Sequence, residues 1–106
     1  MNEPNQSPEK LVEEARSQVD PLFLAVIEVL NEHGNFLPMA FFSELLIQLR
    51  QIEREADLLQ LFFQLSTAAF QGFTLNPAEA AVIDELLERC QMIAFTLSAE
   101  TSHGAH

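Results

Sequence analysis

The feature that most constrains this fold is a stretch of 33 residues, Met39 to Gln71, that contains neither glycine nor proline. Within it, apolar side chains recur at gaps that are mostly three or four residues, which places them along one side of a helix. These are Phe42, Leu45, Leu49, Ile52, Ala56, Leu59, Phe63 and Phe70. One helix of this length is about 50 Å long, whereas a compact chain of this size has a radius of gyration of about 13 Å. The pattern predicts a long central helix over about residues 38–71, packed against a second subunit.

The polar middle of this stretch leaves an alternative open. Between Arg50 and Asp57, only Ile52 and Ala56 are apolar. If Asp57 caps a new helix and Gln60 completes a capping box, the stretch forms an antiparallel hairpin of two ordinary helices. The usual helix length of about 11–12 residues favours the hairpin. The helix-favouring residues and the unbroken phase of the apolar positions favour one helix, which is the structure we expect.

Capping residues followed by proline mark the other helix starts. Ser7-Pro8 and Asp20-Pro21 predict two successive helices with a break or sharp kink between them, because proline disfavours a helical residue before it. Gly34 is suited to end the second helix. Asn76-Pro77 with Glu79 forms a capping box at the start of a long C-terminal helix over about 77–98.

No segment shows the alternation expected of strands, so the predicted fold class is all-α. We expect a small helical bundle of four to five helices, formed by a single domain over 7–98. Residues 1–6 are predicted to be a disordered N-terminus and residues 99–106 a flexible tail, because both are polar or small.

The charge balance excludes several classes of partner. Five Lys+Arg against sixteen Asp+Glu give a formal net charge of −11, so we expect no nucleic acid partner and no anionic membrane partner. Another protein with a basic surface is permitted. The longest apolar run, Pro21 to Ile27, is far shorter than the ~20 residues of a membrane helix. The single cysteine, Cys90, and the polar N-terminus predict a cytoplasmic location.

The chain offers few groups for chemistry. His33 has no second ligand at helical spacing, and we place it at the end of a helix, where a donor meets free carbonyls. Cys90 falls on the apolar stripe of the last helix and is expected to be a core residue. We therefore predict no enzyme activity, no catalytic or metal site and no cofactor. Arg50 and Arg54 are expected to be solvated; the alternative is a polar contact with an acidic group of a partner.

The remaining signal is an excess of apolar bulk. All aromatic residues are phenylalanine, nine in number, and two neighbouring pairs make the central stretch apolar on more than one side. Either the core within one chain is broad, or one side contacts another chain. We expect a non-catalytic interaction protein, an adaptor, regulator or chaperone, that forms an acidic homodimer. Its predicted interface residues are Phe41, Phe42, Leu45, Leu49, Phe62, Phe63, Phe70 and Phe73.

Two other functions stay open. In the first, phenylalanines together with Met39 and Met92 hold an apolar small molecule between helices. In the second, the acidic chain imitates nucleic acid, although its carboxylates are spread over every segment rather than along one ridge.

Overall fold

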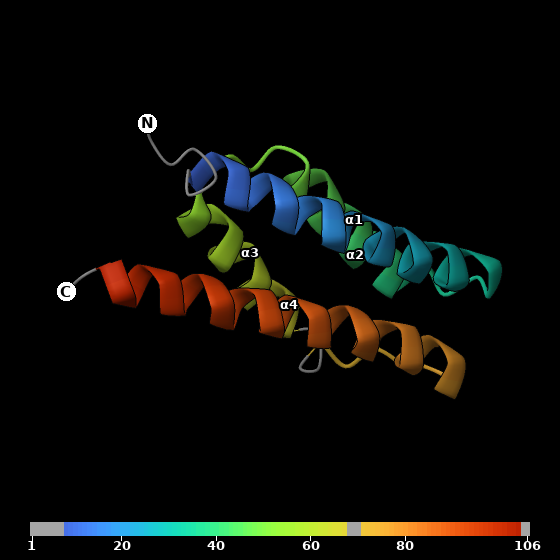
Figure 1. Cartoon of the computed structure of the whole chain (residues 1–106). Helices are drawn as coiled ribbons and strands as arrows, with labels where there is room; N and C mark the ends of the chain where they lie inside the picture. The colour runs from blue at the N-terminus through green and yellow to red at the C-terminus, as the bar shows by residue number, and fades with distance from the viewer. Residues whose placement is uncertain (1–7, 68–70, 105–106) are drawn as a thin grey trace.

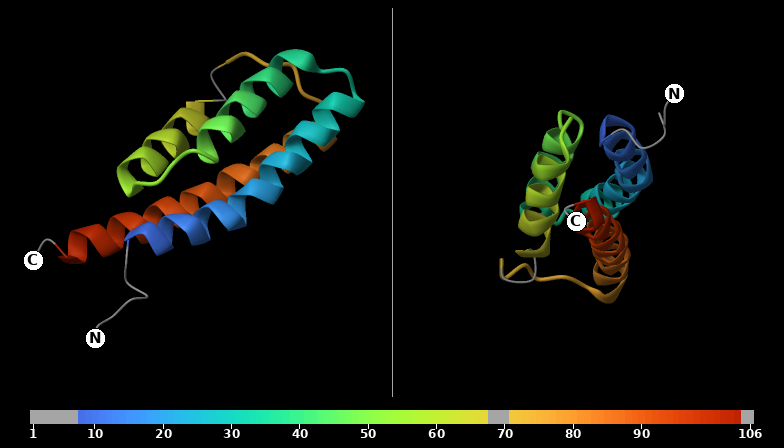
Figure 2. Two further views of the ribbon diagram at one scale, coloured as in Figure 1. Left: turned by 90° about the horizontal axis from the view of Figure 1, so that it is seen from above. Right: turned by 60° about the vertical axis from the view of Figure 1, so that its left-hand side comes forward.

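The computed structural model describes residues 8–67 and 71–104, and four α-helices account for most of that part of the chain. They are α1 (Pro8–Glu32), α2 (Phe36–Leu49), α3 (Glu55–Ser66) and α4 (Pro77–Gly104). Within these ranges there is no strand, so the all-α prediction is confirmed. The two long helices α1 and α4 lie side by side, and the shorter pair α2 and α3 forms a second layer across them (Figures 1 and 2).

The predicted central helix over 38–71 is wrong. α2 ends at Leu49, the chain turns through 50–54, and α3 begins at Glu55 and runs back beside α2 (Figure 2). The hairpin alternative is the observed structure, although α3 starts before Asp57, after Arg54 in an extended conformation. The reason is burial: folding back places the apolar faces of both helices in one core, where Leu49 and Leu58 are 0% exposed.

At Asp20 the prediction was a break or a sharp kink between two helices, and the break is absent, because α1 is continuous through Pro21. Pro21 is exposed, and the axis of α1 changes direction along its length in the left-hand view of Figure 2. Proline inside a helix costs about 3 kcal/mol, yet one apolar stripe continues on both sides of it. Its members are at most 4% exposed: Val12, Ala15, Val19, Phe23, Val26 and Leu30. Packing of this stripe against the core outweighs the local cost of the proline.

Local signals at the other helix ends predicted the structure better. Gly34 has a φ of 70°, in the left-handed region that glycine adopts without strain, and it turns the chain from α1 into α2. At the start of α4, the Glu79 amide donates to Asn76 Oδ1 at 2.8 Å, and the Asn76 amide donates to Glu79 Oε1 at 3.0 Å. The predicted capping box is therefore confirmed.

The predictions for the two ends of the chain can be compared with the structure only in part. α4 continues to Gly104, past its predicted end near residue 98. The predictions for residues 1–6, for Ser7 and for the last two residues lie outside the described ranges. Over the described helices, none combines the length and the hydropathy needed to cross a membrane.

Candidate functional site

The predicted interface residues do not form one exposed face. Phe42, Leu45, Leu49 and Phe62 are at most 6% exposed and belong to the core of a single subunit. Phe41 and Phe73 are half-buried and contact each other edge-on, with ring centroids 5.5 Å apart. Phe63 stands apart, because its side chain on α3 is 70% exposed. Phe70 lies outside the described residues.

The two predicted polar contact residues differ in their surroundings. Arg50 donates from Nε and Nη2 to the two carboxylate oxygens of Asp20, at 2.8 and 2.9 Å, so its guanidinium is already engaged within the chain. These hydrogen bonds lower the pKa of Asp20 from its ordinary value. Arg54 is 79% exposed and lies 3.6 Å from the carboxylate of Asp57, a weak surface pair.

Arg16 holds the turn between α2 and α3, a role that sequence reasoning missed. Its Nη1 donates to the carbonyl of Ile52 at 2.8 Å, and its Nη2 donates to the carbonyl of Arg50 at 3.2 Å. The carbonyl of Arg50, the C-cap residue of α2, lacks a partner within the helix. The guanidinium of Arg16 satisfies it together with the carbonyl of Ile52 in the turn. The available signal was weak: Arg16 is the one basic residue beside the apolar stripe of α1.

A cluster of polar side chains connects the start of α4 with the turn between α1 and α2. Glu79 is only 2% exposed. His33 Nδ1 lies 2.7 Å from Glu79 Oε2, and Asn35 Nδ2 donates to Glu79 Oε1 at 3.2 Å. Together with the Asn76 amide, these contacts satisfy both carboxylate oxygens. His33 thus contacts a side chain of α4 rather than the free carbonyls we expected.

This cluster favours a structural role over a chemical one. Chiefly through the backbone hydrogen bond from Asn76, and also through His33 and Asn35, the pKa of Glu79 is held below its ordinary value. A carboxylate that stays ionised and fully paired is a poor general acid or base near neutral pH. Within the described residues, no three His, Cys, Asp or Glu side chains are grouped so that they could hold a metal ion.

Cys90 is a core residue, as its position on the apolar stripe of α4 predicted. Its side chain is 3% exposed, and burial raises the pKa of the thiol to about 12. Because the thiolate is the reactive form, the thiol is inert at neutral pH.

The surface carries a mainly apolar groove between α3 and α4. It has a volume of about 220 Å³ and is lined by residues of both helices. These are Leu59, Phe62, Phe63, Ser66, Leu87, Cys90, Gln91 and Ala94. None of them is charged, and the exposed ring of Phe63 belongs to the lining.

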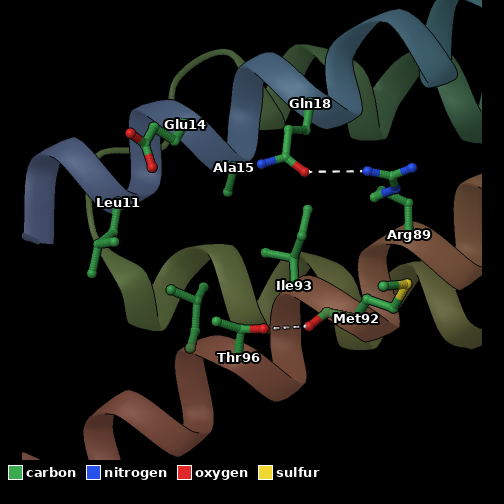
Figure 3. Close-up of a pocket in the computed structure, with 9 residues that line it drawn as sticks. Leu11, Glu14, Ala15, Gln18, Arg89, Met92, Ile93 and Thr96 are labelled. Atoms are coloured by element: carbon green, nitrogen blue, oxygen red, sulfur yellow. Dashed lines mark hydrogen bonds between the residues drawn. The ribbon is translucent and has the colours of Figure 1, made fainter.

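A second groove, between α1 and α4, is more polar and has a volume of about 200 Å³. Figure 3 shows Leu11 and Ala15 directed from α1 toward α4, with Ile93 directed back toward α1. Arg89 Nη1 approaches Gln18 Oε1 at 3.4 Å and links the two helices above these side chains. Met92 lines this groove as well.

A third groove, of about 480 Å³, lies beside the α1–α2 turn. It is lined by Asn35, Leu37, Pro38, Phe41, Gln71, Gly72, Phe73 and Thr74.

Comparisons with known proteins assign this chain to no family: no family model matches it, and no curated protein and no solved structure shows significant similarity to it. Over the residues that the structure describes, the chain is an all-α protein of four helices. Its function has to be argued from its own residues.

Proposed function

We propose that this protein is a non-catalytic protein–protein interaction module, an adaptor, regulator or chaperone-like protein that acts as an acidic homodimer. One observation carries the proposal. Large apolar side chains remain exposed outside the buried core, and Phe63 and Phe95 are 70% and 77% exposed. Phenylalanine has no polar group with which to meet water. Burying such rings against another protein is therefore favourable.

The surroundings of the titratable groups support a binding role. His33 is engaged with Glu79, and Cys90 is enclosed in the core. Neither lies beside a free nucleophile or base in a pocket, the arrangement that catalysis requires. Within residues 8–67 and 71–104, the features that could accept a partner are surface grooves and exposed rings rather than arrays of reactive groups.

We place this role in the cytoplasm, where a single unpaired cysteine is typical. The charge of −11 also permits a protein with a basic surface as a further partner. Of the two arginines predicted as polar contacts, Arg50 and Arg54, the second is the more exposed, and we propose that it contacts an acidic group of a partner.

Sedimentation equilibrium at micromolar concentration tests the homodimer. We expect a mass of twice the 11.9 kDa of one chain, because association removes the exposed rings from water. A species that stays at 11.9 kDa across the accessible concentration range would contradict the homodimer.

A second candidate, an apolar small-molecule carrier, is favoured by the third groove. Its volume of about 480 Å³ falls in the ~300–1,000 Å³ range of ligand sites, and Phe41 and Phe73 contribute apolar surface to it. The α3–α4 and α1–α4 grooves are smaller than that range. Native mass spectrometry of freshly purified protein separates the candidates, since a carrier is expected to retain a small-molecule mass.

A further inference from the structure

Two segments of the chain contain no charged residue, and the helices that they form lie next to each other. Residues 58–78 contain no charged side chain, and neither do residues 90–99, although the chain holds sixteen acidic residues. In the structure, most of α3 comes from the first of these segments, and the second supplies the later part of α4. These two helices run antiparallel to each other (Figures 1 and 2). Residues of both line the α3–α4 groove.

We call this surface the charge-free face, and define it as the groove-lining residues of α3 and α4 together with Phe95. Phe63 contributes a ring that is 70% exposed on the α3 side. Phe95, 77% exposed, lies about one helical turn beyond Gln91 of the groove lining. Between the two helices, Leu59 and Ala94 are only partly buried. The face thus combines a groove with protruding rings, which is the anatomy of an interface core.

We propose that a second copy of this chain docks on the charge-free face in a two-fold symmetric dimer, with Phe63 of each copy packed against the α3–α4 groove of the other. This inference rests on the homodimer proposed above and adds the location of its interface. A two-fold dimer uses the same patch on both copies, so the patch must be self-complementary. A groove beside an exposed phenylalanine meets that condition.

Charge favours a second copy over a basic partner at this face. Two chains of −11 repel each other wherever their carboxylates approach. Contact centred on the groove-lining residues, none of which is charged, leaves no charge buried without a partner at the centre of the interface. The exposed Glu88, one helical turn before Gln91 on α4, lies at its edge. A basic protein gains its affinity from carboxylates, and these lie elsewhere on this chain.

The test replaces exposed side chains with glutamate and measures the dimer dissociation constant by sedimentation equilibrium. Phe63→Glu introduces a charge into each copy's side of the interface, and we expect dimerisation to weaken by about a hundredfold or more. Phe95→Glu is the second variant on the same face. Leu37→Glu is the matched control, because Leu37 is 79% exposed and lies on α2, outside the charge-free face.

Each outcome either supports or contradicts the docking of a second copy on the charge-free face. Circular dichroism is expected to show unchanged helix content, since all three side chains are exposed in one subunit. A wild-type dimer that Phe63→Glu and Phe95→Glu leave intact would overturn this location while the homodimer stands. The same conclusion follows if Leu37→Glu disrupts the dimer as strongly. A monomeric wild type would overturn both proposals and leave the face to a partner of different chemistry.

Discussion

Glu79 shows how a single side chain can join segments that are far apart in the sequence. Its carboxylate caps α4 locally through the Asn76 amide, and it also accepts from Asn35 and contacts His33, which belong to the α1–α2 connection. The local half of this arrangement could be predicted, because a capping box has a fixed spacing of three residues. The partners 44 and 46 residues away could not, because sequence spacing does not reveal which turns meet in space.

The contacts of Glu79 predict a specific dependence of stability on pH. The pKa of Glu79 is below its ordinary value of 4.5 in the folded protein. Its ionised form therefore stabilises the fold above pH 4.5, and this contribution is lost as the pH falls through the lowered value. We expect Glu79→Gln to lower the free energy of unfolding at a pH of about 7, with the difference from wild type narrowing at a pH of about 3.

Chemical denaturation followed by circular dichroism measures this difference. Glu85→Gln is the matched control, because Glu85 is exposed on the same helix and its replacement removes the same charge. A Glu79→Gln deficit that stays constant between the two pH values would mean that the ionised carboxylate is not the stabilising form.

At the scale of helices, the spacing of apolar residues predicted the helical segments on both sides of the α2–α3 turn but not the turn itself. The spacing of apolar residues correctly identified helix on both sides of Arg50, and Phe42, Leu45 and Leu49 of the predicted stripe do face the core. In α3 the stripe was wrong: its members Ala56 and Phe63 are exposed, and the buried side chains are Leu58, Leu61, Phe62 and Leu65. The same spacing was also compatible with uninterrupted helix, because both halves happen to keep one phase. What decides between the two is tertiary: the burial of both apolar faces and the hydrogen bonds from Arg16.

Removing the guanidinium of Arg16 should therefore destabilise the hairpin. Arg16→Met keeps much of the aliphatic stem but leaves the carbonyls of Ile52 and Arg50 without this donor. We expect the free energy of unfolding to fall by about 1–2 kcal/mol, since hydrogen bonds from charged groups are among the stronger ones.

Urea denaturation at a fixed protein concentration provides the measurement. Arg54→Met is the control, because Arg54 is 79% exposed and forms only a weak pair; its loss should change stability by less than about 0.5 kcal/mol. Equal effects of the two substitutions would show that Arg16 does not hold the turn.

Considered as a whole, the molecule combines strong acidity with one surface that carries no charge. Composition predicted the acidity, but the existence of the charge-free face depends on how the chain folds, since α3 and the end of α4 are separate in sequence and adjacent in space. The long helix that first suggested a dimer is absent. The support for association now comes from exposed rings and from the placement of charge.

The proposed dimer is expected to respond to salt because of this arrangement. Because each chain carries a charge of −11, repulsion between the copies opposes association, and salt screens it. We expect the dissociation constant to fall several-fold as sodium chloride rises from about 50 mM to about 500 mM, measured by sedimentation equilibrium. A dimer held by oppositely charged contacts would weaken instead.

The reaction of Cys90 with a thiol reagent can report how often α3 and α4 separate. The only thiol in the chain is enclosed where α3 packs on α4, so a soluble thiol reagent can react only when these helices separate. The labelling rate therefore measures how often α3 and α4 separate spontaneously. A labelling rate of Cys90 that is slower in concentrated than in dilute samples would show that a neighbouring molecule holds α3 and α4 together.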